Sequence, residues 1–408
     1  MLPKQQMGGS VCNASIETVN TEATDPSEAK KIVLNAGRSE KVNVYVPPST
    51  LMVRDIQEQI PAEYFQRSMW RSFSYLSRDM FQLFLTFVIM YNFVLPMLDS
   101  SLLNAVPPVA WLSRAAAWMI YWFVQGLNGT ALWVLAHECG HQAFCNSRRV
   151  NNAVGMILHS ALLVPYHSWR LTHGTHHKHT NHLTKDLVFV PVQRSAVGEA
   201  VEEAPIVMLW NMALMFLFGW PMHLLVNVGG QKFDRFTSHF DPNAPFFRRA
   251  DYNNVMVSNM GVLLTLSILG ACSWSFGFAV VVRWYLIPYL WVNFWLVYIT
   301  YMQHSDVRLP HYTHDHWTYV RGAVAAVDRD FGPLLNSWLH HINDSHVVHH
   351  LFSQMPHYNA IEVTRKHIRD ILGDLYVTDA KPLLKSLVHT WRECRYVVPS
   401  EGICITRS

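Results

Sequence analysis

The stretch MIYWFVQGLNGTALWVLAHECGHQAF, residues 119–144, joins a long apolar run to two histidines that lie four residues apart. The apolar run is close to the roughly 20 residues that a helix needs to cross a bilayer. At its end, His137 and His141 would lie one helical turn apart on one face, as two ligands of a single metal ion require. The stretch therefore predicts a membrane helix that carries part of a metal site at its end.

The composition of the whole chain is that of a membrane protein. Of its 408 residues, 50% are hydrophobic and only 15% are charged, against about 25% in an ordinary globular protein. The net charge of +3 is too small to indicate nucleic-acid binding, and we expect none. The six cysteines form no CxxC motif, which favours a reduced compartment without disulfides.

The two ends of the chain differ from its middle. Residues 1–45 begin with a polar segment and contain no signal peptide, so we expect a disordered N-terminal arm. Residues 46–375 are expected to form the membrane domain, with an amphipathic helix from about residue 358. Residues 376–408 are expected to be a C-terminal tail.

Apolar stretches long enough to span a bilayer fall at 80–98, 111–136, 206–228, 255–282 and 284–302. A shorter run at 154–166 is expected to lie at the membrane interface or to pack as a core helix.

The polar regions rich in histidine decide which of these stretches span. They lie at 137–186, 304–316 and 340–357, and they must share one membrane face if they build one site. The number of crossings between the first two regions must then be even, although three apolar stretches lie there. We expect 206–228 not to span, because polar residues and Pro221 interrupt it and its tryptophans favour an interface. The predicted fold is an all-α membrane protein of about four spanning helices with interfacial helices, capped by a cytosolic helical domain.

Histidine recurs in the pattern H-x-x-H-H. HGTHH contains His173, His176 and His177, and HVVHH contains His346, His349 and His350. With the first pair, eight clustered imidazoles exceed the four ligands of a tetrahedral zinc site, so we infer two metal ions. Imidazole suits Zn, Cu, Fe and Ni alike. A site beside a lipid substrate favours oxygen-activating iron, because an unactivated hydrocarbon needs an oxidant stronger than any side chain.

These motifs resemble the membrane-bound fatty acyl desaturases, in particular the Δ12 and ω-3 branch of fungi and plants. Besides the histidine motifs, the resemblance lies in VRDIQEQIPAEYFQRSMWRSFSYLSRD at 53–79, EEAP at 202–205 and VRGAVAAVDRDFGPLLN at 320–336. It covers nearly everything from about residue 45 to 370.

The resemblance implies a di-iron centre that uses O2 and two electrons to remove hydrogens from adjacent methylenes, leaving a cis double bond. It implies an acyl-lipid substrate with an 18-carbon chain, and Δ12 desaturation of an oleoyl to a linoleoyl group is the expected reaction. The implied electron donor is cytochrome b5 with its NADH-dependent reductase. The implied location is the endoplasmic reticulum membrane, with a multi-pass chain whose active site faces the cytosol.

The resemblance also implies the metal ligands. They are the eight clustered histidines and one more in YMQHSD, which matches the family's Q-H-T motif: His137, His141, His173, His176, His177, His304, His346, His349 and His350. Ligating histidines normally donate their second ring N–H to a carboxylate or carbonyl. Among nearby carboxylates, Asp186 and Asp344 are the first candidates for this catalytic support, whereas Glu138 either orients a ligand or faces water.

Some positions depart from the family pattern and leave the reaction outcome open. Asn181 stands where the second histidine motif usually has Gly, Ala326 replaces Thr, and Val307 replaces Pro. An ω-3 desaturase, acetylenase, conjugase or hydroxylase therefore remains an alternative, because small shifts in substrate position redirect this chemistry. A His-rich transition-metal transporter is the alternative from another class, although its ionisable residues would be expected inside the spans. The acyl carrier and the oligomeric state stay open.

Overall fold

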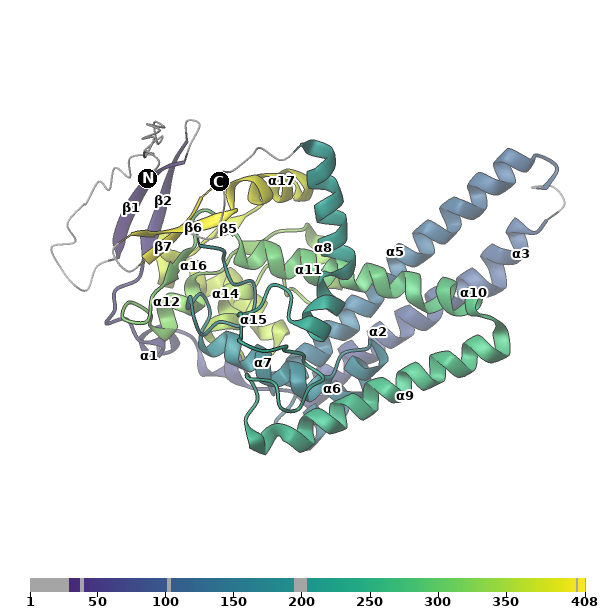
Figure 1. The fold of residues 1–408 in the computed structure, drawn as a ribbon, viewed down its shortest axis with the longest axis horizontal. Coiled ribbons are helices and arrows are strands. Elements are labelled where there is room, and N and C mark those ends of the chain that lie inside the picture. The colour runs from purple at the N-terminus through teal and green to yellow at the C-terminus, as the bar shows by residue number, and fades with distance from the viewer. Residues whose placement is uncertain (1–28, 37–39, 101–103, 194–203, 401–402, 408) are drawn as a thin grey trace, which may run out of the picture.

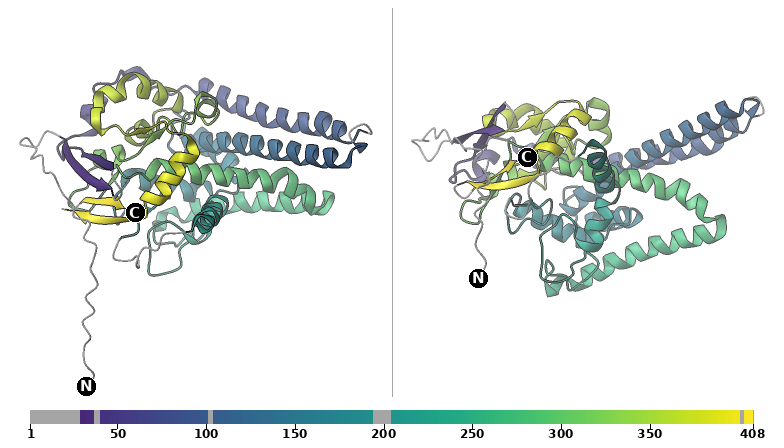
Figure 2. Two further views of the ribbon diagram at one scale, coloured as in Figure 1. Left: turned by 90° about the horizontal axis from the view of Figure 1, so that it is seen from above. Right: turned by 45° about the horizontal axis from the view of Figure 1, so that its top comes forward.

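Long helices dominate the structure. The computed structural model describes residues 29–36, 40–100, 104–193, 204–400 and 403–407, and in it the longest helices project together from a head of shorter elements (Figures 1 and 2). The projecting helices are α2 (Met69–Ile89), continued by a π-helical turn (Met90–Val94) into α3 (Leu95–Leu98); α5 (Pro107–Gly140); α9 (Tyr252–Phe276); and α10 (Phe278–Val281), continued by a second π-helical turn (Val282–Leu286) into α11 (Ile287–His304).

Several helices have the length and hydropathy of membrane spans. Among the described residues they are Met69–Leu98, Pro205–Val226, Arg249–Phe276 and Phe278–His304. They expose large apolar side chains, for example Phe84 on α2 and Leu264 on α9, each 62% exposed. Apolar surface on this scale is suited to lipid and not to water. The predicted class, a mainly helical multi-pass membrane protein, is confirmed.

The structure refines the prediction for two of the membrane spans. The predicted span 111–136 falls within α5, which is not among the four most hydropathic segments but runs outward beside α2 (Figure 1). Residues 206–228, which were expected not to span, form most of α8 (Pro205–Val226). This helix is long and apolar enough to cross a membrane. Figures 1 and 2 nevertheless show α8 lying across α11 instead of projecting with it. This orientation suits a helix that lies in the membrane interface.

The inner end of α5 packs closely against α11. Every residue of α5 from Gln125 to Cys139 is buried, and glycine allows the two backbones to approach. A Cβ on Gly126 would lie 2.2 Å from Cβ of Trp291, and one on Gly129 would lie 2.7 Å from Cγ2 of Val292. Small residues serve this purpose between membrane helices. The close contact sets the distance between the histidines that end α5 and His304, which ends α11.

The head consists of short helices and small sheets. Its helices are α1 (Val53–Gln57), α6 (Arg148–Ala161), α7 (Tyr166–Lys178), α12 (Tyr319–Val324), α13 (Pro333–Trp338), α14 (His346–Leu351), α15 (His357–Val363), α16 (Arg369–Leu372) and α17 (Leu383–Glu393). Its sheets are antiparallel β1 (Lys30–Ala36) and β2 (Glu40–Val46); antiparallel β3 (Pro310–Tyr312), β7 (Ile403–Arg407) and β6 (Tyr396–Ser400) in that order; and parallel β4 (Asp328–Arg329) and β5 (Thr378–Asp379).

Both ends of the chain contain paired segments that the sequence did not predict. Residues 30–36 and 40–46, within the expected disordered arm, pair as β1 and β2, while residues 1–28 lie outside the described chain. The expected tail 376–408 packs on the head through β5, α17, β6 and β7. The buried guanidinium of Arg329 anchors it, because it donates to the carboxylates of Asp306 and Asp379 and to the hydroxyl of Ser386.

Substituting Gly126 with Ala should destabilise the protein. The added methyl group would overlap the backbone-proximal Cβ of Trp291, so the helices must separate, and overpacking typically costs about 1–3 kcal/mol. The measurement is the midpoint of thermal unfolding of the purified protein in detergent. Gly270→Ala is the control, because no heavy atom lies within 4 Å of a Cβ placed at that position on α9. Equal unfolding midpoints for the two variants would contradict the proposed close contact.

Candidate metal centre

The nine candidate histidines come from four helices and meet between them. His137 lies on α5 and His141 caps it, HGTHH lies on α7, His304 ends α11, and HVVHH lies on α14. Eight of the nine are buried, and His173 is half-buried. The structure therefore brings together residues that are up to 213 positions apart in the chain, from 137 to 350.

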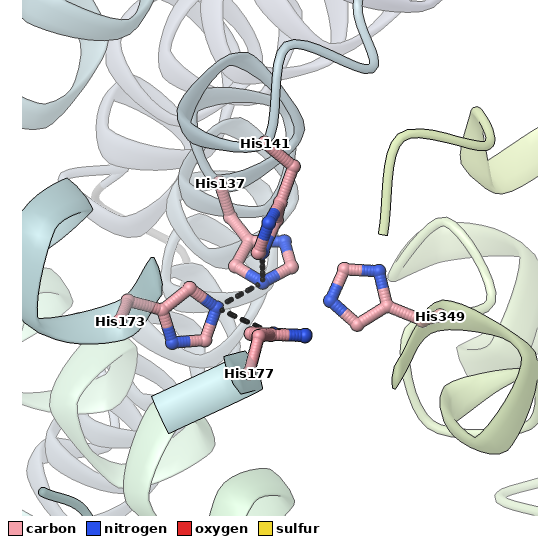
Figure 3. A group of neighbouring side chains, drawn as sticks. All are labelled: His137, His141, His173, His177 and His349. Atoms are coloured by element: carbon pink, nitrogen blue, oxygen red, sulfur yellow. Dashed lines mark hydrogen bonds between the residues drawn. The ribbon is translucent and has the colours of Figure 1, made fainter. Parts of the chain in front are cut away.

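Five of these histidines form one group. The nearest ring nitrogens of His137, His141, His173, His177 and His349 all lie within 4.8 Å of one another (Figure 3). Nε2 of His137 is 2.8 Å from Nε2 of His173 and 3.2 Å from Nε2 of His141. Two nitrogens bound at about 2.1 Å to one metal ion, at roughly a right angle, are about 3 Å apart. The spacing is that of ligands around one ion.

The remaining four histidines form a second group. His176, His304 and His350 each offer a nitrogen within 4.8 Å of the other two. His346 joins them, because its Nε2 is 3.0 Å from Nε2 of His304 and 2.9 Å from Nε2 of His350. The two groups together can hold two metal ions, which matches the number inferred from the sequence. The role of each histidine as a ligand stays a prediction.

The burial of these imidazoles keeps them in the neutral form that binds metal. Burial lowers the pKa of His141 to about 3. Burial, together with the neighbouring imidazoles, also lowers the pKa of His173 and His177 well below the ordinary value. Because a metal ligand must be unprotonated, the low pKa values favour metal binding at neutral pH.

Asp186 holds His176 in the orientation that a ligand needs. Its Oδ1 is 2.7 Å from Nδ1 of His176, and the carboxylate also accepts the backbone N–H groups of Asn181 (2.8 Å) and Val188 (3.1 Å). The other ring nitrogen, Nε2 of His176, is buried without a hydrogen-bond partner among the described residues. A carboxylate on Nδ1 leaves the lone pair of Nε2 for a metal ion.

Glu138 is buried, so it does not face water. Its Oε2 accepts the backbone N–H of His357 at 2.9 Å, and its Oε1 lies 4.0 Å from Nδ1 of His349. Nε2 of His349, like that of His176, is buried without a partner among the described residues. Of the two alternatives that the sequence left open for Glu138, burial excludes exposure to water, and orientation of a ligand stays a prediction.

Asp344 lies beside a different histidine. Its carboxylate oxygens are 3.0 and 3.1 Å from Nδ1 of His341, which belongs to neither group. His340 and His341 both have positive φ, at 54° and 59°, so the chain turns sharply just before HVVHH. Asp344 therefore contacts a neighbouring histidine, which is not one of the nine candidate ligands.

Thr180 is a partner of the site that the sequence did not reveal. Its hydroxyl donates to the carbonyl of His176 at 2.9 Å, so its oxygen remains free to accept from Nδ1 of His350 at 3.1 Å. That hydrogen bond places the proton of His350 on Nδ1 and leaves Nε2 for a metal ion. The signal in the sequence that could have revealed this partner is a residue with a hydroxyl group, Thr180, four positions after His176.

The departure at Asn181 has a structural explanation. Asn181 has φ of 56°, a conformation that glycine adopts freely and asparagine tolerates better than most other residues. Its side-chain amide donates to the carbonyl of Ala325 at 2.6 Å. Asparagine therefore preserves the turn after the second histidine motif, where the family usually has glycine.

An apolar space adjoins the two groups. A small cavity of about 40 Å³ is lined by His137, His173, His176, His304 and His346. Beside it lies a cavity of about 220 Å³, lined mainly by apolar side chains of α5, α7, α8, α11 and the loop after α7. Both cavities are lined by Trp133, Leu296 and Thr300, so the apolar space reaches the candidate ligands.

Comparison with known proteins identifies the family. The sequence profile described as "Fatty acid desaturase" matches residues 116–381, which is more than half of the chain. The chain belongs to the fatty acid desaturase family. The resemblance stated from the histidine motifs is thereby confirmed.

Individual members of the family are similar over most of their length. A Delta(12) fatty acid desaturase from Mortierella isabellina is 44% identical, over 87% of this chain and 90% of the relative. An omega-6 fatty acid desaturase from Glycine max, named an endoplasmic reticulum isozyme, is 42% identical over 85% of this chain and 88% of the relative. An oleoyl-12-hydroxylase from Ricinus communis is 40% identical over 87% of this chain and 88% of the relative.

Replacing Asp186 with Asn should weaken metal binding by about 10- to 100-fold, because the carboxylate that orients His176 is lost. The measurement is the metal content of the purified protein after dialysis against increasing concentrations of a chelator. Asp344→Asn is the matched control and should retain metal like the unsubstituted protein, because Asp344 contacts His341. Equal metal loss from both variants would contradict the role of Asp186.

Proposed function

We propose that the chain is a membrane-bound acyl-lipid desaturase that introduces a cis Δ12 double bond into an oleoyl chain and produces a linoleoyl chain. The observation that carries this proposal is the position of two groups of buried imidazoles beside an apolar cavity. The relatives support the choice of reaction, because the fungal protein that is 44% identical is named a Delta(12) desaturase.

The two histidine groups would hold two iron ions. Iron bound there would supply, with O2, an oxidant strong enough to remove hydrogens from unactivated methylenes. The overall reaction converts –CH2–CH2–, O2, two electrons and two protons into –CH=CH– and two molecules of water. The donor set fits this use, because all nine side chains offer imidazole nitrogen and imidazole suits iron.

The chain's own residues bind the substrate and keep water away from it. The apolar cavity would receive part of the acyl chain, with Trp133 and Leu296 lining it close to the histidines. The ring of Trp133 stacks on that of His137, with centroids 5.6 Å apart and planes at 19°. Holding two adjacent methylenes in a fixed place beside the metal ions is the main contribution that a protein makes to such a reaction.

The head would face the cytosol and receive electrons from cytochrome b5 and its NADH-dependent reductase. The histidines that end α5 and α11 lie at the head end of the projecting helices (Figure 1), which supports a site on one membrane face. Residence in the endoplasmic reticulum is supported by the name of the soybean relative. The membrane domain would extend over residues 46–375, of which the family profile matches the part from residue 116 onward.

Oxygen insertion is the second candidate reaction. The relative from Ricinus communis is named an oleoyl-12-hydroxylase and is 40% identical to this chain. Hydroxylation and desaturation can share an oxidant and differ in the position of the substrate. The activities of an ω-3 desaturase, an acetylenase and a conjugase are further alternatives on the same scaffold. The transporter alternative is set aside, because the family consists of enzymes and the histidine groups lie at helix ends.

Expression in a yeast that makes no polyunsaturated lipids should yield linoleate, as measured by gas chromatography of the fatty acid methyl esters. Feeding oleate and linoleate separately distinguishes Δ12 from ω-3 activity, and a hydroxylated product would favour the second candidate. The purified protein should contain two iron ions per chain. No new fatty acid under aerobic, iron-replete conditions would contradict the proposal.

Substituting His176 with Ala should reduce the product below detection while the protein still accumulates in the membrane, because a candidate ligand of the second group is lost. His389→Ala on α17 is the matched control, since His389 is exposed and belongs to neither group. Full activity of the His176 variant would overturn the ligand assignment.

A further inference from the structure

Phe189 has a backbone conformation that a bulky residue rarely adopts. Its φ is 47°, in the left-handed region, where the Cβ of an L-residue is crowded by the backbone. Such outliers persist only where the surrounding structure enforces them, and they cluster at functional sites. Phe189 lies in the loop that follows α7, three residues after Asp186.

Hydrogen bonds on both sides of Phe189 enforce this conformation. The N–H of Val188 donates to Oδ1 of Asp186 at 3.1 Å, and the N–H of Val190 donates to the carbonyl of Gly229 at 3.1 Å. Further along, the N–H of Val397 donates to the carbonyl of Val192 at 2.9 Å. The loop is thus attached to the carboxylate that holds His176 and to strand β6.

Phe189 lies between two cavities. One is the apolar cavity of about 220 Å³ beside the candidate ligands. The other, of about 180 Å³, has polar side chains in its lining, among them Ser305, His311 and Thr406, and it also reaches His304. Phe189 and Gly229 are the residues that line both cavities. Since Gly229 has no side chain, Phe189 is the residue with a side chain that borders both spaces.

The ring is held in place by α11. Its centroid is 5.9 Å from that of Tyr301, and it packs against the main hydrophobic core between α5, α8 and α11. A residue in a fixed position at the end of an apolar space limits the length of any chain that enters it. Replacing the ring by a methyl group would join the two cavities and extend the space available to an acyl chain.

We propose that Phe189 is a specificity-determining residue that closes the acyl cavity and sets the length of the acyl chain that the protein accepts. This inference rests on the proposed function. Phe189 lies outside both histidine groups, so substituting it should change the choice of substrate and not metal binding.

The test is a size series at this position. Phe189→Ala, Phe189→Leu and Phe189→Trp are expressed in yeast fed with monounsaturated acids of 16, 18 and 20 carbons, and the conversion of each acid to its diene is measured by gas chromatography. One methylene in an apolar pocket changes specificity by about 10- to 200-fold. Phe189→Ala should therefore raise the conversion of the 20-carbon acid relative to the 18-carbon acid by at least about tenfold. Phe189→Trp should shift the preference toward the 16-carbon acid, and Phe189→Leu should resemble the unsubstituted protein.

Two further measurements make the outcome decisive. Phe294→Ala removes an aromatic ring that packs against the same core but lines neither cavity, and it should leave the chain-length ratio unchanged. Immunoblots of the membrane fraction show how much of each protein accumulates. Unchanged ratios in both the Ala and Trp variants would overturn the role of Phe189 alone. Complete loss of activity in all three variants at normal protein levels would also overturn it. No diene from the unsubstituted protein would overturn the proposed function, and this inference with it.

Discussion

The gathering of nine imidazoles at one point, eight of them buried, is the constraint on which the rest of the structure depends. Polar groups taken out of water must find partners, and neutral imidazoles packed with their Nε2 atoms about 3 Å apart satisfy one another poorly without a metal ion. Four helices must end or turn at the same place to bring them together. The glycine contacts between α5 and α11 and the crossing of α8 over α11 serve this meeting point.

The carboxylate of Asp186 contacts three parts of the structure. It orients a candidate ligand, it accepts the N–H of Asn181 in the turn after the second histidine motif, and it accepts the N–H of Val188 at the start of the cavity wall. The carboxylate therefore contacts both His176 and the loop that carries Phe189. In this way the same side chain supports the metal centre and the shape of the substrate space.

The sequence predicted those parts of the site that depend on local spacing. Imidazoles four residues apart share a helix face, so the pairs His137 and His141, His173 and His177, and His346 and His350 follow from the motifs once the helices form. His176 and His349 lie on the same helices but belong to the other group in each case. Asp186 was found because it follows the second motif closely. Asp344 looked equivalent in sequence, but the positive φ angles of His340 and His341 turn it toward His341. The strands at the two ends and the conformation of Phe189 depend on distant partners, which no local pattern reveals.

The anchoring of the C-terminal segment by Arg329 has a consequence for the position of His304. Arg329 lies next to the end of α11, and the partners that neutralise and hold its buried charge include Asp379 and Ser386. Both of these residues follow every histidine of the site in the chain. A buried guanidinium without its carboxylates is strongly unfavourable. The wall that carries His304 is therefore held in part by a segment that lies beyond all nine histidines in the chain.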